Sequence, residues 1–211
     1  MDVRGLTVGP VQENCFVAKP DGGDRAIIVD PGDEAERILQ TVEALGAQVE
    51  AILLTHTHFD HIGAVAPLAR ATGAPVYCPE LETHVLADVM SYVPWPGFGP
   101  YESYEADHTV TGGERLQLAG FDIDVLFVPG HSPGHVAYSI PDEQTLFSGD
   151  VLFQGSIGRT DLPGGDMQTL LASIDELLRT LPDETRVHPG HMGMTTLGRE
   201  RQSNPFIRAT A

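Results

Sequence analysis

Alternating apolar runs and turn signals occupy the first part of the chain. Gly-Pro and Asp-Gly-Gly sequences separate short apolar runs, which is typical of strands joined by turns. Residues 34–45 then carry apolar side chains at helical spacing, and Gly46 stops the pattern. The chain is therefore predicted to begin with strands and continue into a helix. The predicted strands are residues 3–8, 14–18 and 26–29.

A histidine-rich stretch follows the next apolar run, residues 49–54, which reads as a buried strand. The stretch carries His56, His58, Asp60 and His61. Imidazole nitrogens and carboxylate oxygens are ligands that a zinc-like ion prefers. Two histidines lie at the strand end, and the other pair lies at the turn into a helix predicted for residues 62–72. This spacing favours a site for two metal ions over a solvated histidine cluster.

An aromatic segment, residues 92–104, interrupts the regular pattern after a predicted strand (75–78) and helix (80–89). It contains Tyr92, Trp95, Phe98, Tyr101 and Tyr104. Irregular segments of this length often cover a binding site. Exposed aromatic groups also form subunit contacts. The sequence leaves both interpretations open.

The second half repeats the order of strands followed by helices. A helix is predicted for residues 167–181. Two such halves favour two sheets packed face to face with helices outside, in a single α/β domain over residues 1–211. The predicted strands are residues 115–118, 123–128, 136–140, 145–147 and 185–187.

The charge balance narrows the range of partners. The 211 residues include 12 Lys and Arg against 30 Asp and Glu, a formal charge of −18 at pH 7. Phosphate recognition needs clustered basic residues, so neither nucleic acid nor an anionic membrane is expected as a partner. Cys15 and Cys78 are interpreted as buried free thiols. With no secretory signal or membrane-length apolar run visible, the expected location is the cytoplasm.

Metal-type residues also follow three later strands. A glycine stands next to each group, consistent with tight turns that bring these side chains to one edge of a sheet. The candidates are His131 and His135, Asp150, and His188 and His191.

Taken together, these motifs resemble the metallo-β-lactamase fold superfamily, and within it the glyoxalase II-like (hydroxyacylglutathione hydrolase-like) branch. The similarity extends over nearly the whole chain, including residues 149–153, 156–161 and 195–206. It implies a four-layer αββα sandwich. The chain looks like a short form, without the C-terminal helical domain of longer relatives.

The resemblance also implies a ligand set for two divalent metal ions, zinc first, with iron or manganese as alternatives. By this likeness His56, His58 and His131 hold one ion and Asp60, His61 and His191 hold the other. Asp150 bridges both, and the catalytic role is assigned to Asp60 and Asp150. His135 matches a supporting position beside the ligands. His84, His108 and His188 match no ligand position.

The implied reaction is hydrolysis of a small-molecule thioester of the S-lactoylglutathione type by a metal-bridging hydroxide. A bound metal lowers the pKa of water from 15.7 to about 7, which makes hydroxide available at neutral pH. A thiol, with a pKa of about 8.5, leaves as a thiolate without acid assistance, whereas an amide nitrogen must be protonated as it leaves. Arg159 is the one basic residue in a plausible rim loop: it either binds substrate or pairs with Asp161.

Other activities share this scaffold. A persulfide dioxygenase would use one iron on His56, His131 and Asp150, and a lactonase would share the whole ligand set. A metal-binding module without catalysis is a further alternative. Nuclease relatives are disfavoured by the charge of −18.

Overall fold

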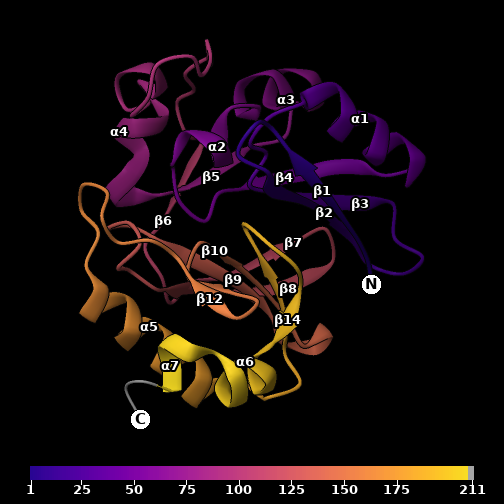
Figure 1. Cartoon of the computed structure of the whole chain (residues 1–211). Coiled ribbons are helices and arrows are strands. Elements are labelled where there is room, and N and C mark those ends of the chain that lie inside the picture. Colours follow the sequence, from indigo (N-terminus) through magenta and orange to yellow (C-terminus); the bar gives the residue numbers. More distant parts are fainter. Residues whose placement is uncertain (209–211) are drawn as a thin grey trace.

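Two β-sheets pack face to face, with helices on both outer surfaces (Figure 1). The structure is a computed structural model and describes residues 1–208. The predicted αββα sandwich is confirmed.

The first sheet is mixed and contains the strands predicted in the N-terminal half. Its first three strands pair antiparallel, and the remaining pairs are parallel. The last strand was not predicted, because it has only three residues and two of them are exposed. In spatial order the strands are β1 (Asp2–Val8), β2 (Glu13–Lys19), β3 (Arg25–Val29), β4 (Gln48–Leu53), β5 (Val76–Pro79) and β6 (His108–Val110).

The second sheet is also mixed, with one parallel pair, β10 and β13. A separate two-stranded ribbon, β11 (Leu152–Phe153) and β12 (Ser156–Ile157), lies outside it. The short strands β11, β12 and β14 were not predicted. The order of the sheet is β14 (Thr195–Thr196), β13 (Arg186–Pro189), β10 (Thr145–Gly149), β9 (Val136–Ile140), β8 (Phe121–Phe127) and β7 (Arg115–Leu118).

Three apolar clusters hold the layers together. On β3, Ile27 and Val29 point between the two sheets, whereas Ala26 and Ile28 point toward the outer helices α1 (Ala35–Ala44) and α3 (Val65–Thr72). The third cluster joins the second sheet to α5 (Met167–Thr180). Because both faces of these strands are buried, they appear in the sequence as continuous apolar runs.

The helix predicted over residues 62–72 is confirmed over residues 65–72, but it begins three residues later than predicted. A separate short helix, α2 (Phe59–Ile62), precedes α3, with Gly63 and Ala64 between them. The N–H of Ala64 donates to the carbonyl of Pro31 at 3.0 Å. A side chain at Gly63 would lie 2.3 Å from the Gly32 carbonyl oxygen, so the chain passes here against a distant loop. That contact ends the short helix.

The helix predicted over residues 80–89 is wrong. The segment forms two 3-10 turns, η1 (Glu80–Glu82) and η2 (Val89–Ser91), on either side of α4 (Thr83–Leu86). Glu82 turns its side chain inward to bind two loops of the candidate site, and its backbone leaves helical geometry. Residues 92–104 contain neither helix nor strand, as predicted.

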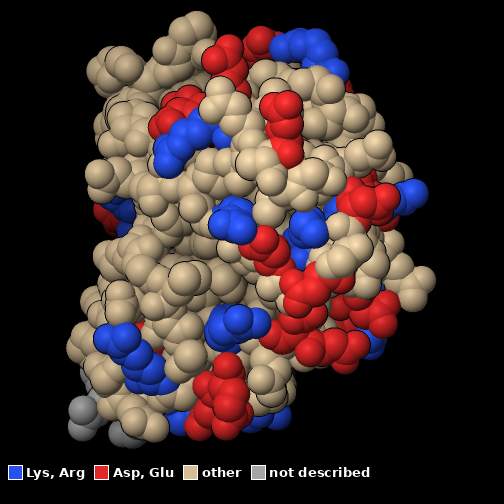
Figure 2. All heavy atoms as spheres, turned by 90° about the vertical axis from the view of Figure 1, so that its right-hand side faces the viewer, with Lys and Arg blue, Asp and Glu red and all other residues tan. Residues whose placement is uncertain are grey.

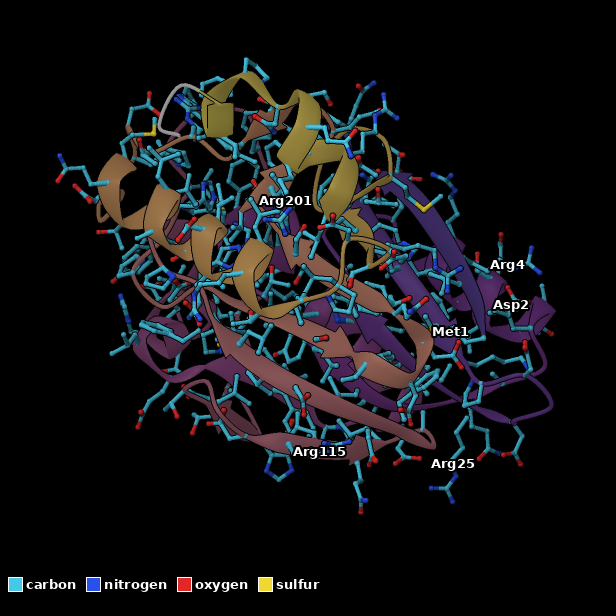
Figure 3. All side chains as sticks on the ribbon, turned by 90° about the horizontal axis from the view of Figure 1, so that it is seen from below. Met1, Asp2, Arg4, Arg25, Arg115 and Arg201 are labelled. Carbon is cyan, nitrogen blue, oxygen red and sulfur yellow. The ribbon has the colours of Figure 1, made fainter. Side chains whose placement is uncertain are left out.

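The C-terminal helices α6 (Leu197–Ser203) and α7 (Pro205–Arg208) were not predicted. Arg201 of α6 reaches toward α5 (Figure 3), where it donates to the carbonyl of Leu178 and pairs with Asp183. The helix α5 itself begins as predicted, because Asp166 accepts the N–H of Thr169 at 2.8 Å and caps its first turn. A further 3-10 turn, η3 (Pro141–Glu143), joins β9 to β10.

Acidic side chains gather on the face shown in Figure 2, and the basic ones are scattered among them. Within residues 1–208, no helix is both long and apolar enough to cross a membrane. The cytoplasmic location stays a prediction.

Candidate metal centre

The side chains predicted as metal ligands meet at one end of the sandwich. The loop after β4 supplies His56 and His58, and the short helix α2 that follows it supplies Asp60 and His61. The segments after β8, β10 and β13 supply the others. Together these residues are His56, His58, Asp60, His61, His131, Asp150 and His191.

The first cluster consists of His56, His58 and His131. Nδ1 of His58 lies 3.2 Å from Nε2 of His56 and 2.8 Å from Nε2 of His131. The three ring nitrogens therefore converge on one point.

The second cluster consists of Asp60, His61 and His191. Oδ2 of Asp60 lies 3.2 Å from Nε2 of His191 and 3.9 Å from Nε2 of His61. His61 is fully buried, and the other two are partly open to a cavity.

Asp150 contacts both clusters. Its Oδ2 lies 3.5 Å from Nε2 of His131 and 3.6 Å from Nε2 of His191. Its Oδ1 lies 3.4 Å from Nε2 of His61. One carboxylate thus joins the first cluster to the second.

These distances fit metal binding. Four ligands placed tetrahedrally at about 2.1 Å from a zinc ion lie about 3.4 Å apart, close to the spacings above. Nε2 of His61 and Oδ1 of Asp150 are buried, and neither has a hydrogen-bond partner among the described residues. Buried polar atoms are rarely left so, and a cation between them would satisfy both.

Two rings of the first cluster, those of His56 and His58, have a lowered pKa. Burial lowers the pKa of His56 well below its usual range. Burial and the neighbouring His131 lower the pKa of His58 to about 4. The neutral ring is the form that binds a metal ion.

The second cluster lies in a strongly negative field. Burial opposes the charge on His61, but Asp150 and Asp60 outweigh it and raise the pKa of His61 well above its usual value. The pKa of His191 is raised in the same way. Burial likewise opposes ionisation of Asp150, yet His61 and the other rings hold the pKa of that carboxyl low. The negative field of Asp60 and Asp150, which stabilises a proton on these rings, would equally stabilise a metal cation that replaces it.

Two buried acidic residues face Nδ1 of His61, the ring nitrogen that points away from the centre, and neither was predicted. Asp30 accepts the N–H and hydroxyl of Thr55, at 2.7 and 2.6 Å, and faces Nδ1 of His61 at 3.2 Å. This leaves Nε2 of His61 for the centre. Asp30 was not among the predicted site residues, although an acidic residue at the end of an apolar strand was the signal used for Asp150.

Glu13 is a second missed residue. Its carboxyl group is buried 3.8 Å from Nδ1 of His61, and neither oxygen has a hydrogen-bond partner within residues 1–208. Burial raises the pKa of this carboxyl group well above its usual range. It lies inside β2, and no local pattern marks it.

The other two histidines near predicted strand ends, His135 and His188, lie in different surroundings. Nε2 of His135 accepts the N–H of Asp150 at 3.0 Å, and its ring stacks on His56 at 4.7 Å, which places it beside the ligands as predicted. His188 is buried between Phe16 and Phe147, and its ring nitrogens have no partner among the described residues.

Arg159 lies at the rim of the cavity that opens onto the clusters. Its backbone carbonyl accepts the Nδ1–H of His131 at 2.7 Å, which leaves Nε2 of that ring for the centre. Its guanidinium pairs with Asp161 at 2.6 and 2.8 Å, one of the two interpretations that the sequence left open. His84 and His108 are exposed; His84 also lines the cavity.

The family model of the metallo-beta-lactamase superfamily matches residues 8–191. The chain belongs to this superfamily. One relative in it, the probable metallo-hydrolase YqgX of Bacillus subtilis, is 43% identical over 212 residues, covering 98% of each chain. Hydroxyacylglutathione hydrolase GloC of Haemophilus influenzae is 37% identical over 211 residues, 99% of each chain.

Solved structures of the metallo-beta-lactamase superfamily agree with this assignment. The BLEG-1 B3 metallo-beta-lactamase has a TM-score of 0.92 and 42% identity, over 98% of this chain and 99% of that one. TTHA1623 in a di-iron-bound form has a TM-score of 0.77 and 44% identity, over 96% and 99%. ETHE1 from Myxococcus xanthus has a TM-score of 0.78 and 28% identity, over 97% and 84%.

Proposed function

We propose that the chain is a metal-dependent hydrolase that cleaves thioesters of the S-lactoylglutathione type, in which a short hydroxyacyl group is carried on a thiol. The observation that carries the proposal is the position of Asp150, whose two oxygens lie 3.4 to 3.6 Å from rings of both clusters. The 37% identity to a hydroxyacylglutathione hydrolase supports the same reaction class.

In this proposal His56, His58 and His131 hold one divalent ion, Asp60, His61 and His191 hold a second, and Asp150 contacts both. Such ions supply Lewis acidity that makes water nucleophilic near neutral pH. The protein's own contribution is orientation, because Asp30 and the Arg159 carbonyl fix the rings of His61 and His131 from behind.

The two carboxylates that face the cavity favour a thiol as leaving group. Asp60 and Asp150 face the cavity, and both have a lowered pKa. They are therefore ionised at neutral pH and have no proton to give. A thiol has a pKa of about 8.5, so it leaves as a thiolate without receiving a proton. A departing amide nitrogen needs a proton, so a β-lactam suits these residues less well.

An iron enzyme is the second candidate, specifically a persulfide dioxygenase. The di-iron-bound form of a 44% identical protein and the 28% identity to ETHE1 favour it. In that case His56, His131 and Asp150 would hold the iron. Nε2 of His131 and Oδ2 of Asp150 lie 3.5 Å apart, which also suits one shared ion.

The test combines metal content with turnover. Protein loaded separately with zinc or ferrous ion would be assayed on S-lactoylglutathione, an uncharged lactoyl thioester, an acyl-homoserine lactone, a β-lactam and glutathione persulfide. We expect about two ions per chain and thioester hydrolysis, which Asp150→Asn lowers by at least about 100-fold. Asp122→Asn, an exposed carboxylate on β8, serves as the control. Oxygen consumption on the persulfide with one iron, and no thioester turnover, would support the second candidate instead.

A further inference from the structure

A cavity of about 820 Å³ lies over the two clusters, and its size suits a small organic ligand. His58, Asp60, His131, Asp150 and His191 form its floor. A bond that is cleaved at this floor must extend the rest of its molecule along the cavity walls.

The walls are apolar. On one side lies Trp95, whose ring is 6.1 Å from Phe59 and 6.2 Å from Phe98. Phe153 and Leu162 also line the cavity. The aromatic segment 92–104 therefore lines a binding cavity through Trp95, which favours the first of its two sequence interpretations.

The walls offer an anionic ligand no unpaired Lys or Arg side chain. Among the lining residues, all of them described, Arg159 is the only Lys or Arg. Its Nε and Nη2 donate to the two oxygens of Asp161 at 2.6 and 2.8 Å, and its guanidinium carbon lies 5.7 Å above the centre of the Trp95 ring. The Nε–Nη2 edge of the guanidinium, which pairs with a carboxylate through two parallel hydrogen bonds, is thus occupied by Asp161.

Glutathione carries two carboxylates, one at its glycine end and one at its γ-glutamyl end. Neither finds an unpaired Lys or Arg side chain among the residues that line this cavity. An uncharged carrier meets no such penalty, and each methylene that it buries against these walls raises affinity by about fourfold.

We propose, on the basis of the thioester hydrolysis proposed above, that this cavity selects thioesters whose thiol portion is uncharged and largely apolar, and discriminates against charged thiols such as glutathione. The Arg159–Asp161 pair is the specificity-determining element, because Asp161 occupies the cation that would otherwise bind a carboxylate.

Binding can be tested without any reaction. S-hexyl-N-acetylcysteamine and S-hexylglutathione are thioethers, which cannot be cleaved and differ only in the thiol. Trp95 is the single tryptophan of the chain, so its fluorescence reports occupancy of the cavity. We expect the uncharged thioether to bind the metal-loaded protein at least about tenfold more tightly. Equal binding, tighter binding of S-hexylglutathione, or no binding of either would overturn the proposal.

A variant tests the charge pair. Asp161→Asn releases the Arg159 guanidinium, so the discrimination between the two thioethers should shrink several-fold. Asp122→Asn is the matched control, because it removes the same charge from another exposed pair, with Arg115 on the outer edge of the second sheet (Figure 3). An unchanged ratio in Asp161→Asn would refute the assigned role of this pair.

Kinetics separates this proposal from the reaction on which it rests. The ratio of kcat/KM for S-lactoyl-N-acetylcysteamine to that for S-lactoylglutathione should be at least about ten. A ratio below one with efficient turnover would overturn the selectivity and leave the hydrolase standing. Tight binding of the uncharged thioether with no turnover of any thioester would support the selectivity and refute the hydrolase.

Discussion

One carboxylate oxygen of Glu82 accepts both the backbone N–H and the hydroxyl of Thr57, at 2.8 and 3.0 Å. Thr57 stands between His56 and His58 in the sequence. The other oxygen accepts the hydroxyl of Ser132 and the N–H of Gly134, the latter at 2.8 Å, in the loop that carries His131. A single buried side chain thus joins the two loops that supply the first histidine cluster.

Replacing Glu82 with glutamine should destabilise the protein and weaken the first metal site. The glutamine side chain keeps one oxygen acceptor, but its NH2 group then faces the donors of Thr57 or Ser132, which lose their acceptor. The expected cost is about 2 kcal/mol or more in the free energy of unfolding. Urea unfolding and metal stoichiometry would measure both effects. The control is Glu80→Gln, two residues earlier and exposed. Wild-type stability and full metal content in Glu82→Gln would contradict the assigned role.

Gly190 tests how closely the backbone approaches the ligands. A side-chain carbon there would lie 2.3 Å from Oδ1 of Asp150 and 2.6 Å from Cε1 of His61. We expect Gly190→Ala to lower metal affinity at least about tenfold, because the added methyl group would push the Asp150 and His61 side chains out of their positions. Competition with a chromogenic chelator gives the affinity. In Gly155→Ala, where nothing lies within 4 Å and φ is +69°, only a stability cost of about 1 kcal/mol is expected. Equal affinities for the two variants would argue against the contact.

His188 should make stability depend on pH. Burial, and then the nearby Arg186, lower its pKa to about 4. Between that value and the unfolded pKa of about 6.5, only the unfolded chain binds the proton, so stability falls as the pH is lowered through this range. From pH 7 to pH 5 this histidine alone should account for about 2 kcal/mol.

Comparison with His188→Leu isolates that contribution. Urea unfolding of the metal-loaded protein at several pH values should give a profile flatter by the same amount in the variant. His108→Leu, which removes an exposed histidine, should follow the wild type. Parallel profiles for wild type and His188→Leu would show that this ring is not the titrating group.

Local patterns in the sequence predicted the layers and the candidate ligand residues. Strands with two buried faces appear as uninterrupted apolar runs, and β3 is an example, with Ala26 and Ile28 on one side and Ile27 and Val29 on the other. His131, Asp150 and His191 were recognisable as candidates because each follows a predicted strand. These signals are local, so they can be read from a few neighbouring residues.

Which of these side chains lie together in the site depends on tertiary contacts between distant loops. His188 and His191 follow the same apolar run, yet the first packs between two phenylalanines and the second reaches Asp60 at 3.2 Å. The roles of Asp30 and Glu82 depend on hydrogen bonds to partners 25 or more positions away, and the break at Gly63 depends on the Gly32 loop. Periodicity reports the face that a residue presents, whereas these contacts arise when distant loops close on one another and must satisfy their buried polar groups.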